Sequence, residues 1–131
     1  MVPEERHIRF TLGGMVFEYD EEKNRKNLQK HGISFKNAAR VFFDYDRIEL
    51  YDVEHSGEEE RYNTIGDTSA GNLTVIGNVL NNDNIVHDIL FVVYTERSMI
   101  AELGNEIEVT RLISARLATN FERGLYYGKL I

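Results

Sequence analysis

The sequence has no cysteine and no long apolar run. Without cysteine, disulfide bonds, cysteine-ligated zinc sites and thiol nucleophiles are excluded. The longest apolar runs, such as ILFVVY at residues 89–94, are far too short to span a bilayer. The first ten residues, MVPEERHIRF, contain early acids and no apolar segment, which argues against a secretory signal. We therefore expect a cytoplasmic protein with no membrane contact.

Familiar catalytic motifs are also missing. There is no P-loop, no G-x-S-x-G and no H-E-x-x-H. The four histidines (His7, His31, His55 and His87) are scattered without the spacing of metal ligands. We expect neither a cofactor nor a resident metal. A metal-dependent nuclease that uses the acids of residues 44–60 is an alternative, but that segment is more simply explained as a solvated face or a partner-binding surface.

What is present suits one folded unit. The chain has 131 residues, of which 42% are hydrophobic and 28% charged, a composition that supports one core and argues against disorder. No repeat, low-complexity tract or linker divides the sequence. We expect a single domain over residues 1–131, with residues 1–16 as an N-terminal arm or hairpin.

The net charge of −7 is unevenly placed along the chain. Residues 44–60 hold eight acids and one arginine, so this segment accounts for the whole net charge. Residues 23–40 hold six basic residues and no acid. A local basic face on an otherwise neutral remainder is compatible with binding a polyanion.

Local signals in the N-terminal third predict a hairpin and two helices. FTLGGMVFEY, residues 10–19, alternates as a strand or hairpin does, with Gly13-Gly14 as the turn. Asp20 as N-cap and Gly32 as C′ residue predict a helix over residues 21–31. Ser34 predicts the start of a second helix, over residues 35–43.

Beyond residue 46 the hydrophobic period switches to two, which predicts strands, and the short turns between them favour antiparallel pairing. The strands expected from this pattern cover residues 47–52, 61–67, 72–80, 87–97 and 106–116. Thr119 and Glu122 form a capping-box pattern that opens a last helix, which runs to about Tyr127. The fold class predicted is α+β: two N-terminal helices, an antiparallel sheet of about four to six strands and one C-terminal helix.

Several cations lie where they suit a phosphate site. Thr95 and Arg97 end a predicted strand and share one face, whereas Glu96 points to the other face. On the next strand, alternation places Arg111 and Arg116 on opposite faces. Arginines beside a basic helix suit a phosphate, because the guanidinium donates hydrogen bonds bidentately and keeps its charge.

Each of these cations also has a plain structural explanation. The lysines of residues 23–30 solvate a helix, and His31 favours the negative end of that helix. Arg97 and Glu96 form an edge ion pair of little energetic value. From the residues alone, the conclusion is an α+β domain with a candidate anion site.

Four segments resemble the BrnT toxin family, in the order expected for that family. They are FEYDEEKNRKNLQKHGISFKNAARVFFD (17–44), IELYDVEHSGEEERYNTIG (48–66), FVVYTER (91–97) and RLISARLATNFERGLYY (111–127). The combination of K-H-G-I-S-F, Y-T-E-R and I-S-A-R is specific, although each motif alone is weak. The resemblance implies a small RelE-like ribonuclease, the toxin of a type II toxin–antitoxin pair. It also implies a BrnA-like antitoxin as partner, which carries the DNA-binding part.

The same resemblance implies metal-independent RNA cleavage, in which a ribose 2′-OH attacks the adjacent phosphate. This reaction needs a proton acceptor, cations and a proton donor. Arg97 and Arg116 take the phosphate role, Glu60 or Glu96 is the base, and the first helix supplies the acid or a further phosphate contact. The catalytic positions implied are Arg97, Arg116, Glu96, Glu60, His31 and Thr95. The RNA-binding positions implied are Lys23, Lys26, Lys30 and Tyr19, with Lys23 and His31 as alternatives for the acid.

This chain departs from the family pattern in three ways. Tyr19 stands where the family often has tryptophan, which keeps an aromatic ring for base stacking. Extra residues occur near 77–90 and 98–106, beside the expected site. The acidic total is unusual for an RNA-binding toxin. The extra residues and the acidic charge favour an alternative: a catalytically inactive module that binds an antitoxin or another protein.

Overall fold

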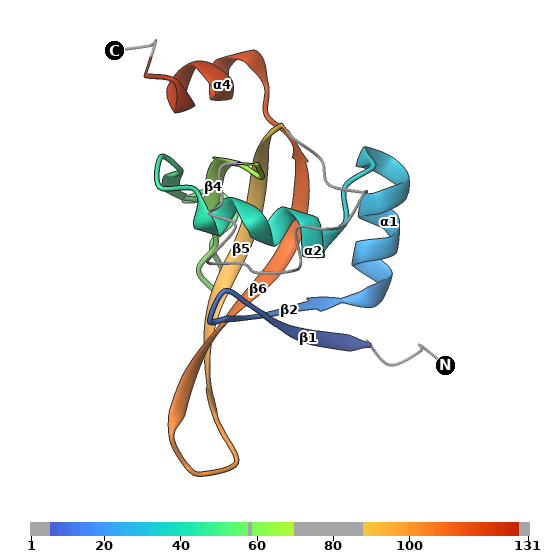
Figure 1. The fold of residues 1–131 in the computed structure, drawn as a ribbon, viewed down its shortest axis with the longest axis vertical. Coiled ribbons are helices and arrows are strands. Elements are labelled where there is room, and N and C mark those ends of the chain that lie inside the picture. Colours follow the sequence, from blue (N-terminus) through green and yellow to red (C-terminus); the bar gives the residue numbers. More distant parts are fainter. Residues whose placement is uncertain (1–5, 58, 70–87, 129–131) are drawn as a thin grey trace.

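The described part of the chain folds into one six-stranded sheet, with helical segments after its second strand and a helix after its last strand (Figure 1). The computed structural model describes residues 6–57, 59–69 and 88–128. In chain order the elements are β1 (His7–Leu12), β2 (Met15–Asp20), α1 (Glu21–His31), α2 (Phe35–Ala38), the 3₁₀ helix η1 (Ala39–Phe43), β3 (Ile48–Tyr51), β4 (Tyr62–Asp67), β5 (Ile89–Ile100), β6 (Glu106–Leu117) and α4 (Asn120–Tyr126). The predicted α+β class is confirmed. The strand expected over 72–80 and the extra residues before 88 lie outside the described residues.

The β1–β2 hairpin turns at two glycines, as predicted. Gly13 and Gly14 have φ values of +54° and +83°. Two positive φ values in a two-residue turn match the twist of the flanking strands. At Gly13 a side chain is excluded for a second reason, because a Cβ atom there would lie 2.4 Å from Cε1 of Phe43.

Both ends of α1 form as the sequence predicts. The Asp20 side chain accepts a hydrogen bond from the Lys23 amide at 3.1 Å. At the other end Gly32, with φ +72°, donates its amide to Leu28. The second helix is interrupted where a continuous helix was expected: α2 tightens into η1 at Ala39, as the last turns of helices often do. The apolar stripe predicted for this segment is nevertheless buried, at residues Phe35, Ala38, Ala39 and Phe42.

The sheet has six strands in the order β1-β2-β6-β5-β4-β3. Four of its five pairings are antiparallel, as predicted, but β2 and β6 run parallel, so the sheet is mixed. A short turn makes only the two strands that it joins antiparallel, and β2 and β6 are far apart in the sequence.

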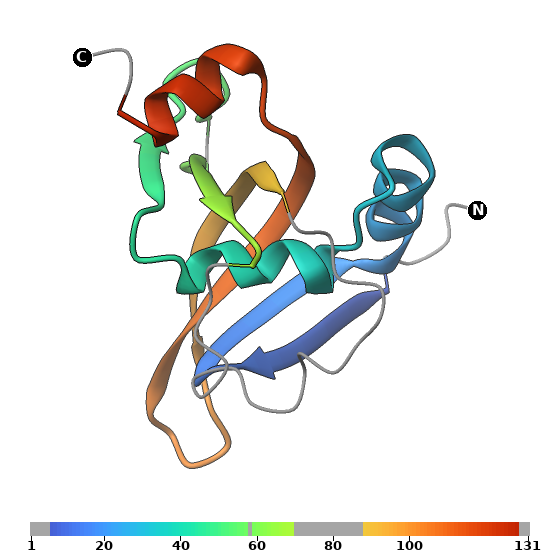
Figure 2. The ribbon, with the colours of Figure 1, turned by 45° about the horizontal axis from the view of Figure 1, so that its top comes forward.

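The β5–β6 hairpin is longer than expected. Its ladder continues past Arg97 to the pair Ile100–Glu106, so Thr95, Glu96 and Arg97 lie inside β5 and not at its end. In Figures 1 and 2 the far end of this hairpin projects away from the rest of the molecule. Residues 98–106 form this projection.

The core lies between one face of the sheet and the α2–η1 segment, which crosses that face in Figure 2. Phe17 and Phe35 are completely buried. Phe42 bridges the strands, with its ring 5.5 Å from that of Phe17 and 4.9 Å from that of Tyr94. Burial of each such ring contributes about 1.5–3 kcal/mol. The opposite face of the central strands is therefore the one left for polar side chains.

A side chain of α1 completes the edge of β6. The parallel pairing of β2 with β6 reaches only Arg111. Beyond it, the Asn27 amide accepts from the Ala115 backbone at 3.1 Å and donates to the Ala115 carbonyl at 2.8 Å. Asn27 therefore takes the place of a neighbouring strand residue and fixes α1 against β6.

Candidate functional site

A bulge in β6 places the site arginines on one face. Val93 pairs with Ser114 and Tyr94 with Leu112, so Ile113 is the additional residue. An extra residue reverses the alternation beyond it. Arg111 and Arg116 consequently share the face opposite the core, whereas simple alternation predicted opposite faces.

The strand register builds a polar row across four strands. Arg9 on β1 pairs with Glu18 on β2, and Glu18 pairs with Arg111 on β6. Arg111 in turn pairs with Thr95 on β5. Residues directly opposite each other in a sheet share a face. Arg97 lies two residues beyond Thr95 and therefore points to the same side.

Arg97 is bound by a carboxylate from a distant segment. Glu59, in the connection between β3 and β4, accepts from Nε of Arg97 at 2.9 Å and from Nη2 at 3.3 Å. The buried Thr95 hydroxyl donates to the same carboxylate at 2.9 Å. The hydrogen bond from Arg97 is the main reason that the pKa of Glu59 lies below its usual value. Glu59 is thus an ionised acceptor beside a cation.

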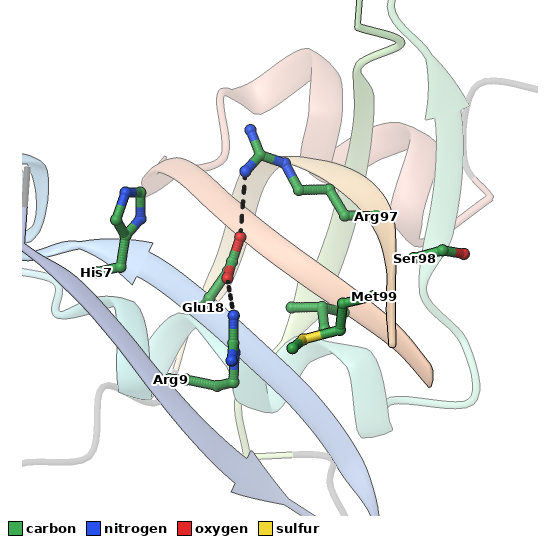
Figure 3. Close-up of a pocket in the computed structure, with 7 residues that line it drawn as sticks. His7, Arg9, Glu18, Arg97, Ser98 and Met99 are labelled. Carbon is green, nitrogen blue, oxygen red and sulfur yellow. Dashed lines mark hydrogen bonds and ion pairs between the residues drawn. The ribbon is translucent and has the colours of Figure 1, made fainter. Parts of the chain in front are cut away.

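Glu18 is the centre of the polar row (Figure 3). It is only 5% exposed and accepts from Arg9 at 2.9 Å, from Arg111 at 3.2 Å and from Arg97 at 3.4 Å. Burial alone raises the pKa of Glu18, but the hydrogen bonds from Arg9 and Arg111 outweigh burial and lower it. The carboxylate therefore stays ionised and orients three guanidinium groups.

A cavity of about 300 Å³ opens beside this carboxylate. His7, Arg9, Glu18 and Arg97 line it, and Met99 supplies an apolar wall. Nδ1 of His7 lies 2.9 Å from Nη1 of Arg111. Because a guanidinium donates and never accepts, Nδ1 must be the acceptor and the proton sits on Nε2.

Arg116 lies apart from this cavity although it shares the face. Glu122 of α4 accepts from its two terminal nitrogens at 2.7 and 3.0 Å. The guanidinium also stacks over the Phe91 ring, 4.2 Å from the centroid. With His55 and Arg61, Arg116 lines a second groove of about 420 Å³.

The two carboxylates expected to act as bases lie elsewhere. Glu60 is exposed and accepts from the Tyr62 hydroxyl at 3.0 Å. Glu96 points to the face opposite Arg97, where burial, then Glu108 and Glu49, raise its pKa. Three consecutive glutamates at 58–60 carry no periodicity, so Glu59 cannot be distinguished from Glu60 by pattern.

The predicted residues of α1 form a separate surface. Lys23, Lys26 and Lys30 are exposed and lie along one stripe of the helix, and His31 is half-buried at its end. Tyr19 is only 4% exposed, because its ring packs against Phe35 with centroids 5.6 Å apart. This burial leaves no ring face for a base, so the stacking role expected for Tyr19 does not fit.

Sequence reasoning missed the residues that surround Arg97. Glu18, Arg9 and His7 alternate along β1 and β2, which was a signal that they share one face, but only the β2–β6 pairing brings them to Arg111. Asn27 offered no such signal, because its burial, and with it the need for hydrogen-bond partners, is known only from the structure.

The residues that the structure describes include neither a cluster of metal ligands nor a membrane-spanning helix. Within residues 6–57, 59–69 and 88–128, no three histidine, aspartate or glutamate side chains gather closely enough to ligate a metal ion. In that same part of the chain, no helix has both the length and the apolar character needed to cross a membrane.

Comparison with known proteins identifies the family. No curated protein matches the chain significantly. The family model described as the ribonuclease toxin BrnT of a type II toxin–antitoxin system matches residues 19–86, more than half of the chain. The match spans α1 to β4 and ends before β5, so the Arg97 segment lies outside it. The chain belongs to the BrnT family of ribonuclease toxins of type II toxin–antitoxin systems.

Proposed function

We propose that the chain cleaves RNA without a metal ion, with Glu59 as the proton acceptor and Arg97 as the phosphate ligand. The supporting observation is the Glu59 carboxylate, held 2.9 Å from Nε of Arg97 and 2.9 Å from the Thr95 hydroxyl. The reaction requires a base for the 2′-OH and a cation for the developing phosphate charge. Here both groups lie side by side on an accessible surface.

In this mechanism the ribose 2′-oxygen forms a bond to phosphorus and the bond to the 5′-oxygen breaks. The 2′ proton passes to Glu59. The leaving 5′-oxygen takes a proton from water, because His7, whose Nδ1 accepts from Arg111, would become an imidazolate anion if it released the proton on Nε2. Lys23 and His31, which the resemblance implies as acids, lie on α1 and do not line this cavity.

Substrate binding and base activation are coupled in this arrangement. The Arg97–Glu59 pair is nearly half exposed on both sides, so it is weak and exchangeable. An RNA phosphate competes with Glu59 for the guanidinium. As Glu59 loses that hydrogen bond, its pKa rises and it accepts a proton more readily. Arg116 and the lysine stripe of α1 serve as contacts to the RNA chain further from the reacting phosphate.

The test compares two adjacent glutamates. Glu59→Gln should lower RNA cleavage by roughly 10²–10⁴-fold, the usual contribution of a general base. Glu60→Gln is the matched control and should stay within about twofold, because a surface change of this kind disturbs little. Cleavage by the purified proteins in EDTA, and growth of bacteria expressing them, provide the two measurements.

The outcomes separate the competing hypotheses. Cleavage that survives in EDTA but fails in Glu59→Gln supports the proposal. Loss in Glu60→Gln with activity in Glu59→Gln would overturn the assignment of the base. Activity abolished by EDTA would favour the metal-dependent alternative. A folded wild-type protein that neither cuts RNA nor arrests growth would identify the chain as the inactive binding module.

A BrnA-like antitoxin is the proposed partner, and any DNA contact is proposed to occur through it. A surface around the edge strand β3 supports a protein partner here. Tyr45, Val53 and Tyr51 are 88%, 74% and 49% exposed there, among the acids of residues 44–60. Exposed apolar groups mark interaction surfaces, and an acidic surround favours a basic partner. Val53→Asp should weaken capture of the protein encoded next to the toxin, measured by co-purification, while RNA cleavage persists.

A further inference from the structure

The cavity beside Glu18 has an arginine that the cleavage step does not use. Arg9 comes from β1, which lies outside the family match. Its side chain is 48% exposed and its guanidinium donates one hydrogen bond to Glu18. A guanidinium has five N–H donors, so this single bond leaves most of its donor capacity toward the cavity and solvent.

Arg9 and Arg97 are held on either side of one carboxylate. Arg97 donates to one oxygen of Glu18 and Arg9 to the other (Figure 3). The two guanidinium groups are therefore separated by the width of a single carboxylate, a spacing that one nucleotide of an extended strand can span. Glu18, which lines the cavity, is 5% exposed and is paired with the 7% exposed Arg111, whereas the side chains of Arg9 and Arg97 are nearly half exposed.

We propose that this cavity is a phosphate subsite, in which Arg9 binds the RNA phosphate that flanks the one held by Arg97. The inference rests on the proposed function, because it takes Arg97 as the ligand of the scissile phosphate. In this hydrogen-bonded group of described residues the guanidinium groups outnumber the carboxylates. Arg9, Arg97 and Arg111 are the donors, and Glu18 and Glu59 are the acceptors. An RNA backbone is the polyanion that a row of such cations tracks.

The subsite explains why a buried carboxylate belongs in a phosphate-binding surface. Glu18 accepts from three arginines at 2.9–3.4 Å, so its charge is fully countered by guanidinium groups. It fixes their positions before RNA arrives, which reduces the ordering that binding requires. Arg9 is thus a substrate-binding residue and Glu18 a positioning residue.

The first experiment measures kcat/KM on two matched RNA substrates. One is a dinucleoside monophosphate with a single phosphate, and the other is the same dinucleotide with an added terminal phosphate on its 5′ or 3′ side. In the wild type, the added phosphate on one side should raise kcat/KM by roughly tenfold through KM, the effect of one charge-assisted hydrogen bond. Arg9→Ala should lose this gain, so that its kcat/KM is the same on the two substrates.

Two further variants separate phosphate binding from a structural role. Arg9→Lys keeps the charge and should retain part of the gain. Arg25→Ala removes an exposed arginine of α1, whose partner is the exposed Glu22, and should retain all of it. Equal losses on both substrates in Arg9→Ala would show that Arg9 only holds Glu18. An undiminished gain in Arg9→Ala would also overturn the subsite.

Binding of uncleavable RNA makes the test independent of catalysis. A 2′-O-methyl dinucleotide lacks the attacking hydroxyl, and its affinity with and without the terminal phosphate is measured by calorimetry. A phosphate-dependent gain that needs Arg9, in a protein that cuts no RNA, would leave the subsite standing and refute the proposed activity. Cleavage that needs Glu59, with no gain that needs Arg9, would refute the subsite alone.

Discussion

Arg97 and Arg116 lie on the same face of the β5–β6 pair, and a carboxylate binds each of them through two nitrogens, yet the two sites are built differently. The Arg116 partner, Glu122, is six residues away and also accepts from the Thr119 amide at 2.8 Å in the capping box of α4. The Arg97 partner, Glu59, is 38 residues away in an irregular connection.

The contrast distinguishes a carboxylate committed to local hydrogen bonds from the one that we propose as the base. Glu122 is only 14% exposed and is fixed by the start of a helix, whereas Glu59 is 45% exposed. Burial raises the pKa of Glu122, but Arg116 and the Thr119 amide outweigh it, so this carboxylate is committed to local hydrogen bonds. An arginine whose partner is exposed and long-range can exchange that partner for a substrate phosphate.

The largest expected effect is a loss of activity when Arg97 is replaced, compared with the same replacement at Arg116. Arg97→Ala should lower kcat at least about 100-fold, as the loss of a charge-stabilising donor does, with a stability change below about 1 kcal/mol. Arg116→Ala should affect stability more than activity. It should lower the free energy of unfolding, measured with denaturant, by about 1–2 kcal/mol, while the folded protein keeps its activity within about tenfold. If Arg116→Ala were the inactive and stable variant, the comparison would be inverted.

An intermediate effect, on stability, is expected from the hydrogen bond that connects α4 to Asp44. The Tyr126 hydroxyl donates to Asp44 at 2.5 Å, and this 1% exposed carboxylate also accepts from the Asp67 amide at 2.9 Å. Tyr126→Phe should reduce the free energy of unfolding by about 1–1.5 kcal/mol, the net value of one such bond. Tyr45→Phe, at an 88% exposed ring, is the control and should change it by less than about 0.5 kcal/mol. Activity of folded Tyr126→Phe that falls as strongly as in Arg97→Ala would show that α4 supports catalysis directly.

The smallest effect is a shift in the titration of Glu59. The hydrogen bond from Arg97 lowers its pKa below the usual 4.5, so the pair adds stability above that value and loses it as the pH falls through the folded pKa. Arg97→Ala should move the titration of the Glu59 carboxyl upward, as followed by carbon NMR. Arg47→Ala, which removes the ion-pair partner of the exposed Glu49, should leave the Glu59 titration in place. An unchanged midpoint in Arg97→Ala would mean that the two groups do not interact in solution.

Elements defined by neighbouring residues were predictable from the sequence. The glycine turn, the Asp20 and Gly32 ends of α1 and the Thr119 capping box all depend on contacts a few residues apart, and each forms as expected. Periodicity also predicted that Thr95 and Arg97 share one face of β5, where both donate to Glu59. The position of the basic residues on α1 followed from the sequence in the same way.

Features that depend on pairing between distant segments were not predictable. The bulge at Ile113 is invisible in alternation and changes the face of Arg111 relative to Arg116. The parallel pairing of Glu18 with Arg111 has no turn to reveal it. Glu59 is selected over Glu60 only because an irregular connection reaches Thr95 and Arg97. The site therefore belongs to the register of the sheet more than to any motif.

The position of β6 in the sheet has a consequence for synthesis on the ribosome. β6 is the last strand along the chain, yet it lies in the interior of the sheet between β2 and β5. Until it emerges, Glu18 has no Arg111 and the Asn27 amide has no Ala115 backbone to bind. Glu18, Asn27 and Arg97 are therefore synthesised before the strand that joins them, and the sheet that holds them together assembles only after β6 has been made.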